Sequence, residues 1–440
     1  MKRRTTIATI LFVGCLLWGA TFSFAQQSIR VVNDAEFSQY MSHMAEPLAK
    51  TLGLDTEQLR FHLVLDDSVN AFVASQRDVF FHSGLIEKAR NANEVRGVLA
   101  HELGHIHGRH LTRMASQAQK LTIPTLLAGV LGIGAAAAGN PMAASAVLAG
   151  GMAAGQSVML QFSRSHEQQA DQIAVNVLTK NNYDPEGLRD FFNRLKTSDL
   201  LFHDAPPPYL LTHPRPQERQ SFLDNVVKNN QVKSETPDET ASFERIKAKV
   251  YAMANSPSRT LRHYYHKESP AITYARVWAY GLQGDLAKSE KLLEELKKEW
   301  PNDVFLTELD GLIQVDKGEL AKAVELFKTA HEQLPSSPKL HYQYALSLYQ
   351  ADLLDDALNE FLQLETQSLE WPNIYRQLGL IYGKQSKLAL SHLSFAEEAM
   401  LKKNWSDAEF HIATAEHYNK NNSQIAARIA ALKMQLADKK

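Results

Sequence analysis

Two histidines and a glutamate within five consecutive residues are the part of the sequence best suited to chemistry. His101, Glu102 and His105 lie in the segment EVRGVLAHELGHIHGRHL, residues 94–111. The apolar residues of this segment recur at helical spacing, which predicts an amphipathic helix. On such a helix the two histidines project about 40° apart, so both imidazoles can bind one metal ion. Glu102 lies beside them, where it can take a proton from a metal-bound water molecule.

A hydrolytic metal site needs a third protein ligand and an open position for water. In the pattern HExxHxxGxxH a third histidine follows a glycine. Gly108 fits this pattern, but Leu111 occupies the required position and the nearest histidine, His110, comes one residue early. On a continuing helix His110 would point about 180°, and His107 about 120°, away from His101. We therefore expect these two histidines to be solvated or to support a ligand from outside.

A glutamate on a second helix is the other source of a third ligand. The segment LQFSRSHEQQADQIAVNVL, residues 160–178, has apolar residues at helical spacing. Glu167 and Asp171 share one face of this helix, one turn apart. A carboxylate ligand with an acidic partner that orients a ligand imidazole forms a complete arrangement. The sequence therefore predicts Glu167 as a metal ligand and Asp171 as the acidic residue that orients a ligand imidazole.

The two motifs together resemble the HtpX and CaaX-prenyl-protease family of zinc metallopeptidases, which carries HExxH and ExxxD on two helices of a gluzincin fold. The resemblance is strongest to the periplasmic BepA-like branch, the β-barrel assembly-enhancing proteases of Gram-negative bacteria, and it covers nearly the whole mature chain. It implies one Zn²⁺ per chain. The ligands would be His101, His105 and Glu167. Glu102 would then be the general base and acid, and Asp171 would support a ligand.

A strand-like stretch also resembles a segment of this family. Asn70, Ala71, Phe72 and Val73 resemble its Asn-Ala-Phe-Ala edge strand and differ from it at Val73. An edge strand can bind an extended peptide by β-augmentation and present it to the metal, so these residues are expected to bind substrate. The alternative is an ordinary core strand.

The segment Leu211-Thr212-His213-Pro214 resembles a family loop whose histidine can take the fourth zinc position. His213 would then be an inhibitory ligand, because it displaces the catalytic water until the loop moves. In the alternative, His213 or the following Arg219 faces the oxyanion of the tetrahedral intermediate. A third possibility is a purely structural loop histidine.

The N-terminal segment predicts export from the cytoplasm. Three basic residues precede an apolar run over Ile7–Trp18, and small residues flank a cleavage site after Ala25. Residues 1–25 are thus expected to be a cleaved signal peptide and the mature protein to be periplasmic. Cys15, the single cysteine, would be removed with it. A lipoprotein signal ending at Cys15 is the rival reading, but Phe12 is a poor match to its usual leucine.

Residues 121–160 carry no charged residue, and a Gly-Asn-Pro sequence divides them into two arms. Each arm is long enough to span a bilayer but is rich in alanine and glycine, so it is only weakly hydrophobic. We expect a helical hairpin against the peptidase domain that contacts membrane lipid or a partner peripherally. A membrane-spanning hairpin and a simple core hairpin are the alternatives.

The C-terminal part repeats at a period of about 34 residues, the length of a tetratricopeptide unit. Small and aromatic residues fill three columns: Gly311, Ala345 and Gly379; Ala323, Ala357 and Ser391; Phe327, Phe361 and Phe395. We expect a tetratricopeptide-repeat domain over residues 269–436, which would be a binding surface. A polar linker and a connecting helix, residues 226–268, would join it to a peptidase domain over residues 26–225.

Composition limits the function classes. The chain has 440 residues, 44% hydrophobic and 22% charged, with a formal net charge of −2. These values indicate a globular protein and argue against binding of nucleic acid, which needs a basic surface. The expected fold is α+β and mostly helical: a gluzincin-type domain with a small sheet, then an all-α solenoid.

The expected function is that of a zinc endopeptidase that degrades misassembled outer-membrane or other envelope proteins. The repeats would bind the unfolded substrate or, as the resemblance implies, the outer-membrane β-barrel assembly machinery. The alternative function is a chaperone or assembly scaffold for β-barrel proteins, with proteolysis normally latched off.

Overall fold

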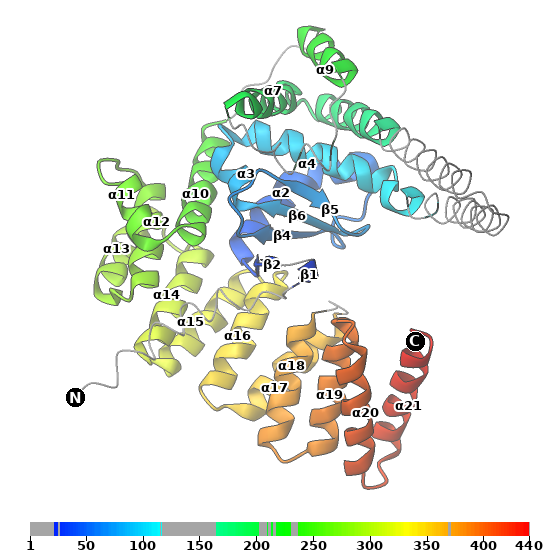
Figure 1. Ribbon diagram of the computed structural model, residues 1–440. Coiled ribbons are helices and arrows are strands. Elements are labelled where there is room, and N and C mark those ends of the chain that lie inside the picture. The colour runs from blue at the N-terminus through cyan, green and yellow to red at the C-terminus, as the bar shows by residue number, and fades with distance from the viewer. Residues whose placement is uncertain are drawn as a thin grey trace, which may run out of the picture. The chain divides into compact units, whose positions relative to one another are not determined.

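The computed structural model describes residues 22–24, 27–114, 116, 164–201, 209, 213, 217–229, 236–367 and 371–439 (Figure 1). The chain separates into two compact units, and the boundary lies between Ser256 and Pro257. This boundary falls inside the stretch 226–268 that the sequence suggests as a linker and connecting helix.

The first unit contains a small mixed sheet of four strands in the order β3-β4-β6-β5. The central strands β4 and β6 run parallel, whereas β3 and β5 pair antiparallel at the two edges. Strand β5 is therefore an edge strand. The bounds are β3 Val31–Val32, β4 Arg60–Val64, β5 Ala71–Val73 and β6 Asp78–His82, and a separate ladder joins β1 Phe22–Phe24 to β2 Gln27–Ile29.

The helices of this unit are α2 Ala35–Leu52, α3 Ser83–Lys88, α4 Ala92–His107, a helix over 164–180, α7 Glu186–Leu201, α9 Gln217–Asn229 and α10 Pro237–Ala254. Helices α2, α3 and α4 pack against the sheet, whereas α7 packs on α4, α9 on α7, and α10 on α2, α3 and α4. Local signals fix where several of them start: the Asp34 side chain accepts a hydrogen bond from Phe37 N, and the Asn91 side chain accepts one from Glu94 N. Thr236 and Glu239 form a capping box, with Pro237 in the first turn of α10.

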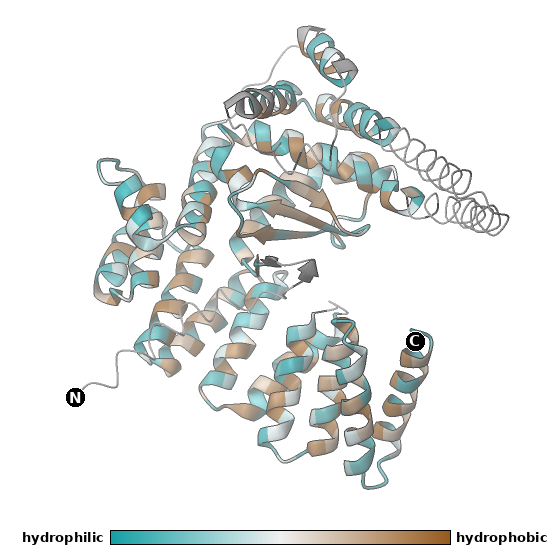
Figure 2. Ribbon diagram, viewed as in Figure 1, coloured by the Kyte–Doolittle hydropathy of each residue, from teal (hydrophilic) through white to brown (hydrophobic). Residues whose placement is uncertain are grey.

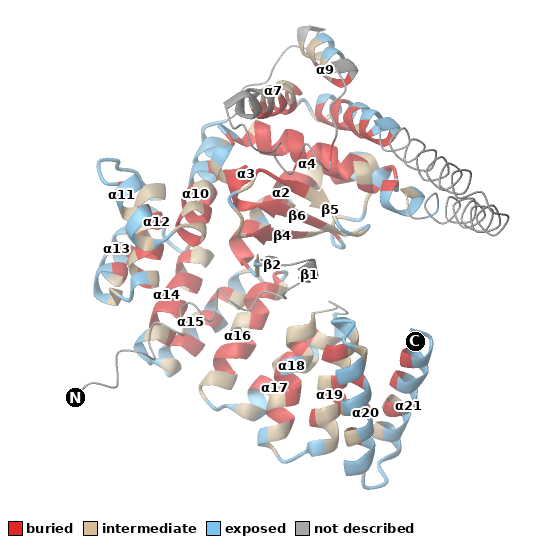
Figure 3. Cartoon of the chain, in the orientation of Figure 1, coloured by how far each residue is buried: buried red, intermediate tan, exposed pale blue. Residues whose placement is uncertain are grey.

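The core of the first unit lies between the sheet and the helices. Helix α2 contacts β4, and α4 contacts β5. The strands are largely hydrophobic (Figure 2), and nearly the whole of α4 is buried (Figure 3). A buried α4 is rigid, which suits a helix that must hold catalytic side chains in place.

From Pro257 onward, the described residues of the second unit form helices in consecutive antiparallel pairs (Figure 1). They are α11 Pro257–His263, α12 Pro270–Gln283, α13 Leu286–Glu299, α14 Val304–Lys317, α15 Leu320–Gln333, α16 Pro338–Gln350, α17 Leu354–Thr366, α18 Pro372–Lys384, α19 Leu388–Leu401, α20 Trp405–Tyr418 and α21 Ser423–Ala437. Together the two units confirm the predicted fold class: mostly helical, with a small sheet in the first unit and helical repeats in the second.

The repeat columns have the predicted packing role. A Cβ atom added to Gly311 would lie 2.9 Å from the ring of Phe327, and one added to Gly379 would lie 2.6 Å from the ring of Phe395. The small residue of one helix therefore makes room for the aromatic residue of its partner helix. Gly379 also accepts a hydrogen bond, through its carbonyl oxygen, from the Ser391 hydroxyl at 2.7 Å.

Two predicted segments lie outside the described residues. They are the apolar hairpin at 121–160 and the signal peptide, of which only residues 22–24 are described. Within the described part of the chain, no helix is both long enough and apolar enough to cross a membrane.

Candidate active site

Helix α4 carries the first two candidate metal ligands. His101 is fully buried, and its Nε2 atom lies 3.1 Å from Nε2 of His105. The two rings are one helical turn apart and meet edge to face. The spacing in the sequence thus produces the predicted convergence of two imidazoles.

The helix over 164–180 brings the carboxylate of Glu167 against both imidazoles. One carboxylate oxygen lies 3.3 Å from His101 Nε2 and the other 3.4 Å from His105 Nε2. Gly104 permits this approach, because a Cβ atom there would lie only 2.9 Å from the carbonyl oxygen of Ala170. The glycine between the two histidines therefore sets the distance between the helices that carry the ligands.

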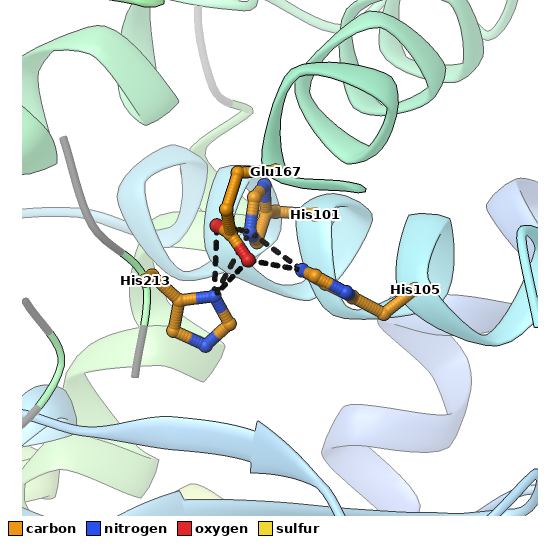
Figure 4. A group of neighbouring side chains, drawn as sticks. All are labelled: His101, His105, Glu167 and His213. Carbon is orange, nitrogen blue, oxygen red and sulfur yellow. Dashed lines mark hydrogen bonds and ion pairs between the residues drawn. The ribbon is translucent and has the colours of Figure 1, made fainter. Parts of the chain in front are cut away.

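His213 completes the cluster from a segment that is distant in sequence. Its Nδ1 atom lies 3.0 Å from a carboxylate oxygen of Glu167 and 3.3 Å from His101 Nε2. One nitrogen or oxygen from each of His101, His105, Glu167 and His213 lies within 4.8 Å of the others, and Figure 4 shows the four side chains pointing toward a common centre. Leu211, Thr212 and Pro214 lie outside the described residues.

These four side chains fit a divalent transition-metal ion. Three imidazole nitrogens and one carboxylate oxygen are ligands that such ions prefer. His101 Nε2 faces two other ring nitrogens and a carboxylate, a crowding that a shared cation relieves. Burial, the main cause, holds the pKa of His105 well below its ordinary value, so this imidazole is neutral and free to bind an ion.

Glu102 is buried beside the ligands. Neither of its carboxylate oxygens has a hydrogen-bond partner among the residues that the structure describes. Burial, the main cause, raises the pKa of this carboxyl above its ordinary value. The Oε1 atom of Glu102 lies 3.5 Å from Nε2 of His213. A buried carboxylate without a structural partner is suited to accept a proton during a reaction.

Asp171 and Arg219 lie behind the ligands. Asp171 Oδ1 lies 2.9 Å from His101 Nδ1, as the sequence predicts for a residue that orients a ligand imidazole. Arg219 contacts Asp171 through Nε at 2.5 Å and Glu167 through another guanidinium nitrogen at 3.0 Å. Burial alone would lower the pKa of His101, but Asp171 and Glu167 raise it to about 9, so positive charge is favoured here.

The position of Arg219 bears on its predicted role. Its guanidinium is buried and holds two carboxylates, which favours a role in fixing Glu167 over one in facing an oxyanion. The oxyanion role remains a prediction.

The expectation of a continuing helix after His107 is wrong. Helix α4 ends there, Gly108 caps it, and Arg109 adopts a left-handed backbone with φ of 52°. The turn brings the buried ring of His110 back under His105, with 3.0 Å between their Nδ1 atoms. His110 therefore supports a ligand, whereas His107 is exposed and contacts the carbonyl oxygen of Leu52. The glycine after the apolar run is a helix-stop signal that predicts this break.

The predicted substrate strand lies close to the segment that carries His213. Tyr209 N donates a hydrogen bond to the carbonyl oxygen of Val69, just before β5, at 3.3 Å. The Tyr209 ring stacks on the His213 ring, with 4.5 Å between the centroids, and His213 N donates to Tyr209 O at 2.8 Å. Sequence reasoning missed Tyr209, because no local signal marks a contact that depends on the tertiary fold. Substrate binding by Asn70, Ala71, Phe72 and Val73 stays a prediction.

The fold and the site together define a metallopeptidase: two histidines on one helix, a glutamate on a second helix, and beside them a buried glutamate whose carboxylate accepts no hydrogen bond from the described residues. Residues 35–227 match the model of peptidase family M48, so this region of the chain is similar to that family.

Several curated proteins are similar to the chain. The β-barrel assembly-enhancing protease of Escherichia coli (strain K12) is 27% identical over 340 residues, which cover 76% of this chain and 69% of that protein. The protein of the same description from Yersinia pestis is 28% identical over 326 residues, 72% of this chain and 66% of the relative. The mitochondrial metalloendopeptidase OMA1 of Schizosaccharomyces pombe is 24% identical over 202 residues, 45% of this chain and 56% of the relative.

Proposed function

We propose that the protein is a zinc-dependent endopeptidase of the periplasm that cleaves misassembled outer-membrane or other envelope proteins. The observation that carries this proposal is the convergence of three imidazoles and one carboxylate beside the buried carboxylate of Glu102, which accepts no hydrogen bond from the described residues. The similarity to β-barrel assembly-enhancing proteases supports the substrate class, and the predicted signal peptide supports the compartment.

His101, His105 and Glu167 would hold the zinc ion. When bound, zinc supplies Lewis-acid activation of the scissile carbonyl and of the attacking water. Glu102 accepts the proton of that water and delivers it to the leaving amine. Asp171 fixes the ring of His101 through Nδ1, and Arg219 holds the carboxylates of Asp171 and Glu167 in place. Burial raises the pKa of the Glu102 carboxyl, which helps this group to hold the proton before it passes to the leaving amine.

Removal of the metal tests the proposal. We expect the mature protein to contain about one zinc per chain and to hydrolyse casein, and we expect a chelator to abolish the hydrolysis and added Zn²⁺ to restore it. Metal analysis and a gel-based cleavage assay provide the measurement. A protein that contains no zinc and cleaves casein equally well with a chelator would contradict the proposal.

His213 is proposed to be a latch. It occupies a place in the ligand cluster where an active enzyme needs water, and its segment also hydrogen-bonds beside β5, the proposed substrate strand. One segment would thus block both the metal and the peptide-binding edge. Opening of the latch would admit water and an extended substrate together.

Replacement of His213 by Ala should therefore raise peptidase activity. If the latch is closed in most molecules, the increase in kcat/KM for casein is expected to be about tenfold. His107→Ala, which changes an exposed histidine outside the cluster, is the control and should leave the activity unchanged. Unchanged or lost activity in the His213 variant would exclude the latch: unchanged activity would indicate a purely structural histidine, and lost activity would favour a role of His213 toward the oxyanion.

The second unit is proposed to bind the substrate chain or the outer-membrane β-barrel assembly machinery. Arrays of paired helices form extended binding surfaces. Residues 121–160 are proposed to contact a membrane or a partner peripherally. The repeats also favour a second candidate function, that of an assembly scaffold for β-barrel proteins in which proteolysis is normally latched off.

A further inference from the structure

The ring of His110 lies between a metal ligand and a glutamine. Its Nδ1 atom is 3.0 Å from Nδ1 of His105, and its Nε2 atom is 3.0 Å from Oε1 of Gln169. The ring also stacks on that of His166, with 4.2 Å between centroids and 6° between planes. This stacking and the burial of His110 hold the ring in one orientation.

The orientation of the Gln169 amide is fixed from outside. Arg113 donates a hydrogen bond through a guanidinium nitrogen to Gln169 Oε1 at 3.3 Å. A guanidinium has donors only, so the atom that it faces must be the amide oxygen. That oxygen can only accept, and His110 Nε2, which faces the same oxygen, must therefore carry a proton.

The protonation pattern then passes along the chain of contacts. A neutral imidazole protonated at Nε2 is an acceptor at Nδ1. His110 Nδ1 therefore accepts a hydrogen bond, and His105 Nδ1–H is the donor that faces it. With its proton on Nδ1, His105 has a free lone pair on Nε2, the atom that lies against His101 and Glu167. The opposite tautomer would place a proton where the ion has to bind.

We propose that His110 is a positioning residue that fixes His105 in the tautomer competent for metal binding. Gln169 and Arg113 in turn fix His110. The inference rests on the proposed metal site. In it, His110 orients His105 in the same way that Asp171 orients His101. Both imidazoles on α4 would then be oriented through their Nδ1 atoms by neighbours outside the ligand set.

Two substitutions of His110 separate hydrogen bonding from packing. Asn has a side-chain oxygen near the position of Nδ1 and can accept the His105 proton, whereas Leu fills the space without an acceptor. The affinity for Zn²⁺ would be measured by competition with a chromophoric chelator, and the thermal unfolding midpoint would be measured on the chelator-treated protein. We expect His110→Leu to weaken zinc binding by about 10- to 100-fold. His110→Asn should retain most of the affinity.

Gln169 provides an independent test because its side chain is exposed and its replacement should not disturb folding. Gln169→Leu is expected to weaken zinc binding, and Gln169→Glu, which keeps an acceptor, to preserve it. Ring nitrogen shifts of His105 in the chelator-treated wild type should report the Nδ1–H tautomer.

The outcomes distinguish the failures. The inference would be overturned if His110→Leu retained the wild-type affinity for zinc. It would also be overturned if the Leu and Asn variants lost zinc affinity equally and both had a lowered thermal unfolding midpoint. A wild-type protein that binds no zinc would instead overturn the proposed metal site itself.

Discussion

Replacement of Glu102 by Gln is expected to lower kcat/KM for a protein substrate by about 10²- to 10⁴-fold, the usual contribution of a general acid–base group. The amide has nearly the shape of the carboxylate but cannot accept the proton of the attacking water. Glu102 is not within the four-residue ligand cluster, so the zinc content should stay at the wild-type level. The measurement pairs the kinetics of casein hydrolysis with metal analysis of the same sample.

The stability of this variant gives a second readout. Glu102 is fully buried and has no hydrogen-bond partner among the described residues, so its charged form opposes folding. We expect the thermal midpoint of Glu102→Gln to equal or exceed that of the wild type. Glu57→Gln, an exposed change of the same chemistry, should alter neither activity nor midpoint. A variant that keeps more than about a tenth of the activity would remove Glu102 from the reaction.

The same variant separates the two candidate functions in cells. If it still supports assembly of outer-membrane proteins, the scaffold activity does not depend on hydrolysis. If outer-membrane assembly fails to the same extent as hydrolysis, the endopeptidase function alone accounts for the role of the protein in assembly. The expression level and the metal content of the variant must match those of the wild type for this comparison.

The pairing of site residues within each helix could be predicted because it depends on local geometry. One helical turn separates His101 from His105 and another separates Glu167 from Asp171, so each pair shares a face whatever the rest of the fold does. The repeat columns were predictable for a similar reason: Gly311 and Gly379 each meet an aromatic residue of the next helix, sixteen residues later in the sequence.

The supporting contacts depend on tertiary structure and could not be predicted in this way. The return of His110 requires the left-handed Arg109, which turns the chain back toward His105. The carboxylate of Glu102 accepts no hydrogen bond because the described elements around it place no donor within reach. A sequence pattern does not predict the absence of such a donor.

Helix α10 shows the same limit at the domain boundary. The change in composition near residue 243 suggests a connecting element, yet α10 is fixed to the first unit by charge pairs. Lys249 is buried and lies 2.7 Å from Asp34 and 2.9 Å from Glu36. Arg96 of α4 pairs with Glu239 at 2.6 Å. These partners are far apart in sequence, so composition alone does not place α10 with the peptidase unit.

Replacement of Arg219 by Met is expected to lower the free energy of unfolding by about 3–5 kcal/mol, because it leaves a buried carboxylate pair without its cation. Asp171 would keep only His101 and Glu167 would keep only imidazoles. Zinc affinity should fall by about 10- to 100-fold, since both carboxylates lose their fixed positions. Denaturant unfolding of chelator-treated protein and zinc competition measure the two effects separately.

The pH dependence of the stability loss identifies the Arg219–Asp171 pair as its source. Burial raises the pKa of Asp171, but Arg219 and His101 outweigh this and hold it below its ordinary value. A depressed carboxyl pKa contributes stability above the unfolded pKa, and this contribution is lost as the pH falls through the folded pKa. The difference in stability between wild type and Arg219→Met should therefore be largest near neutral pH and should narrow below about pH 4.

Arg245→Met is the matched control, because Arg245 pairs with Glu36 away from the site. This variant should lose stability without any loss of zinc affinity.

The alternative role of Arg219 predicts another pattern: if Arg219 faces the oxyanion, its replacement lowers kcat by about 10²- to 10³-fold and leaves zinc affinity unchanged. A fall in kcat with wild-type stability and wild-type zinc affinity would therefore assign Arg219 to the transition state and not to the ligands. The structure favours the opposite result, because the guanidinium of Arg219 lies 2.5 Å from Asp171 and 3.0 Å from Glu167, the two carboxylates behind the proposed metal site.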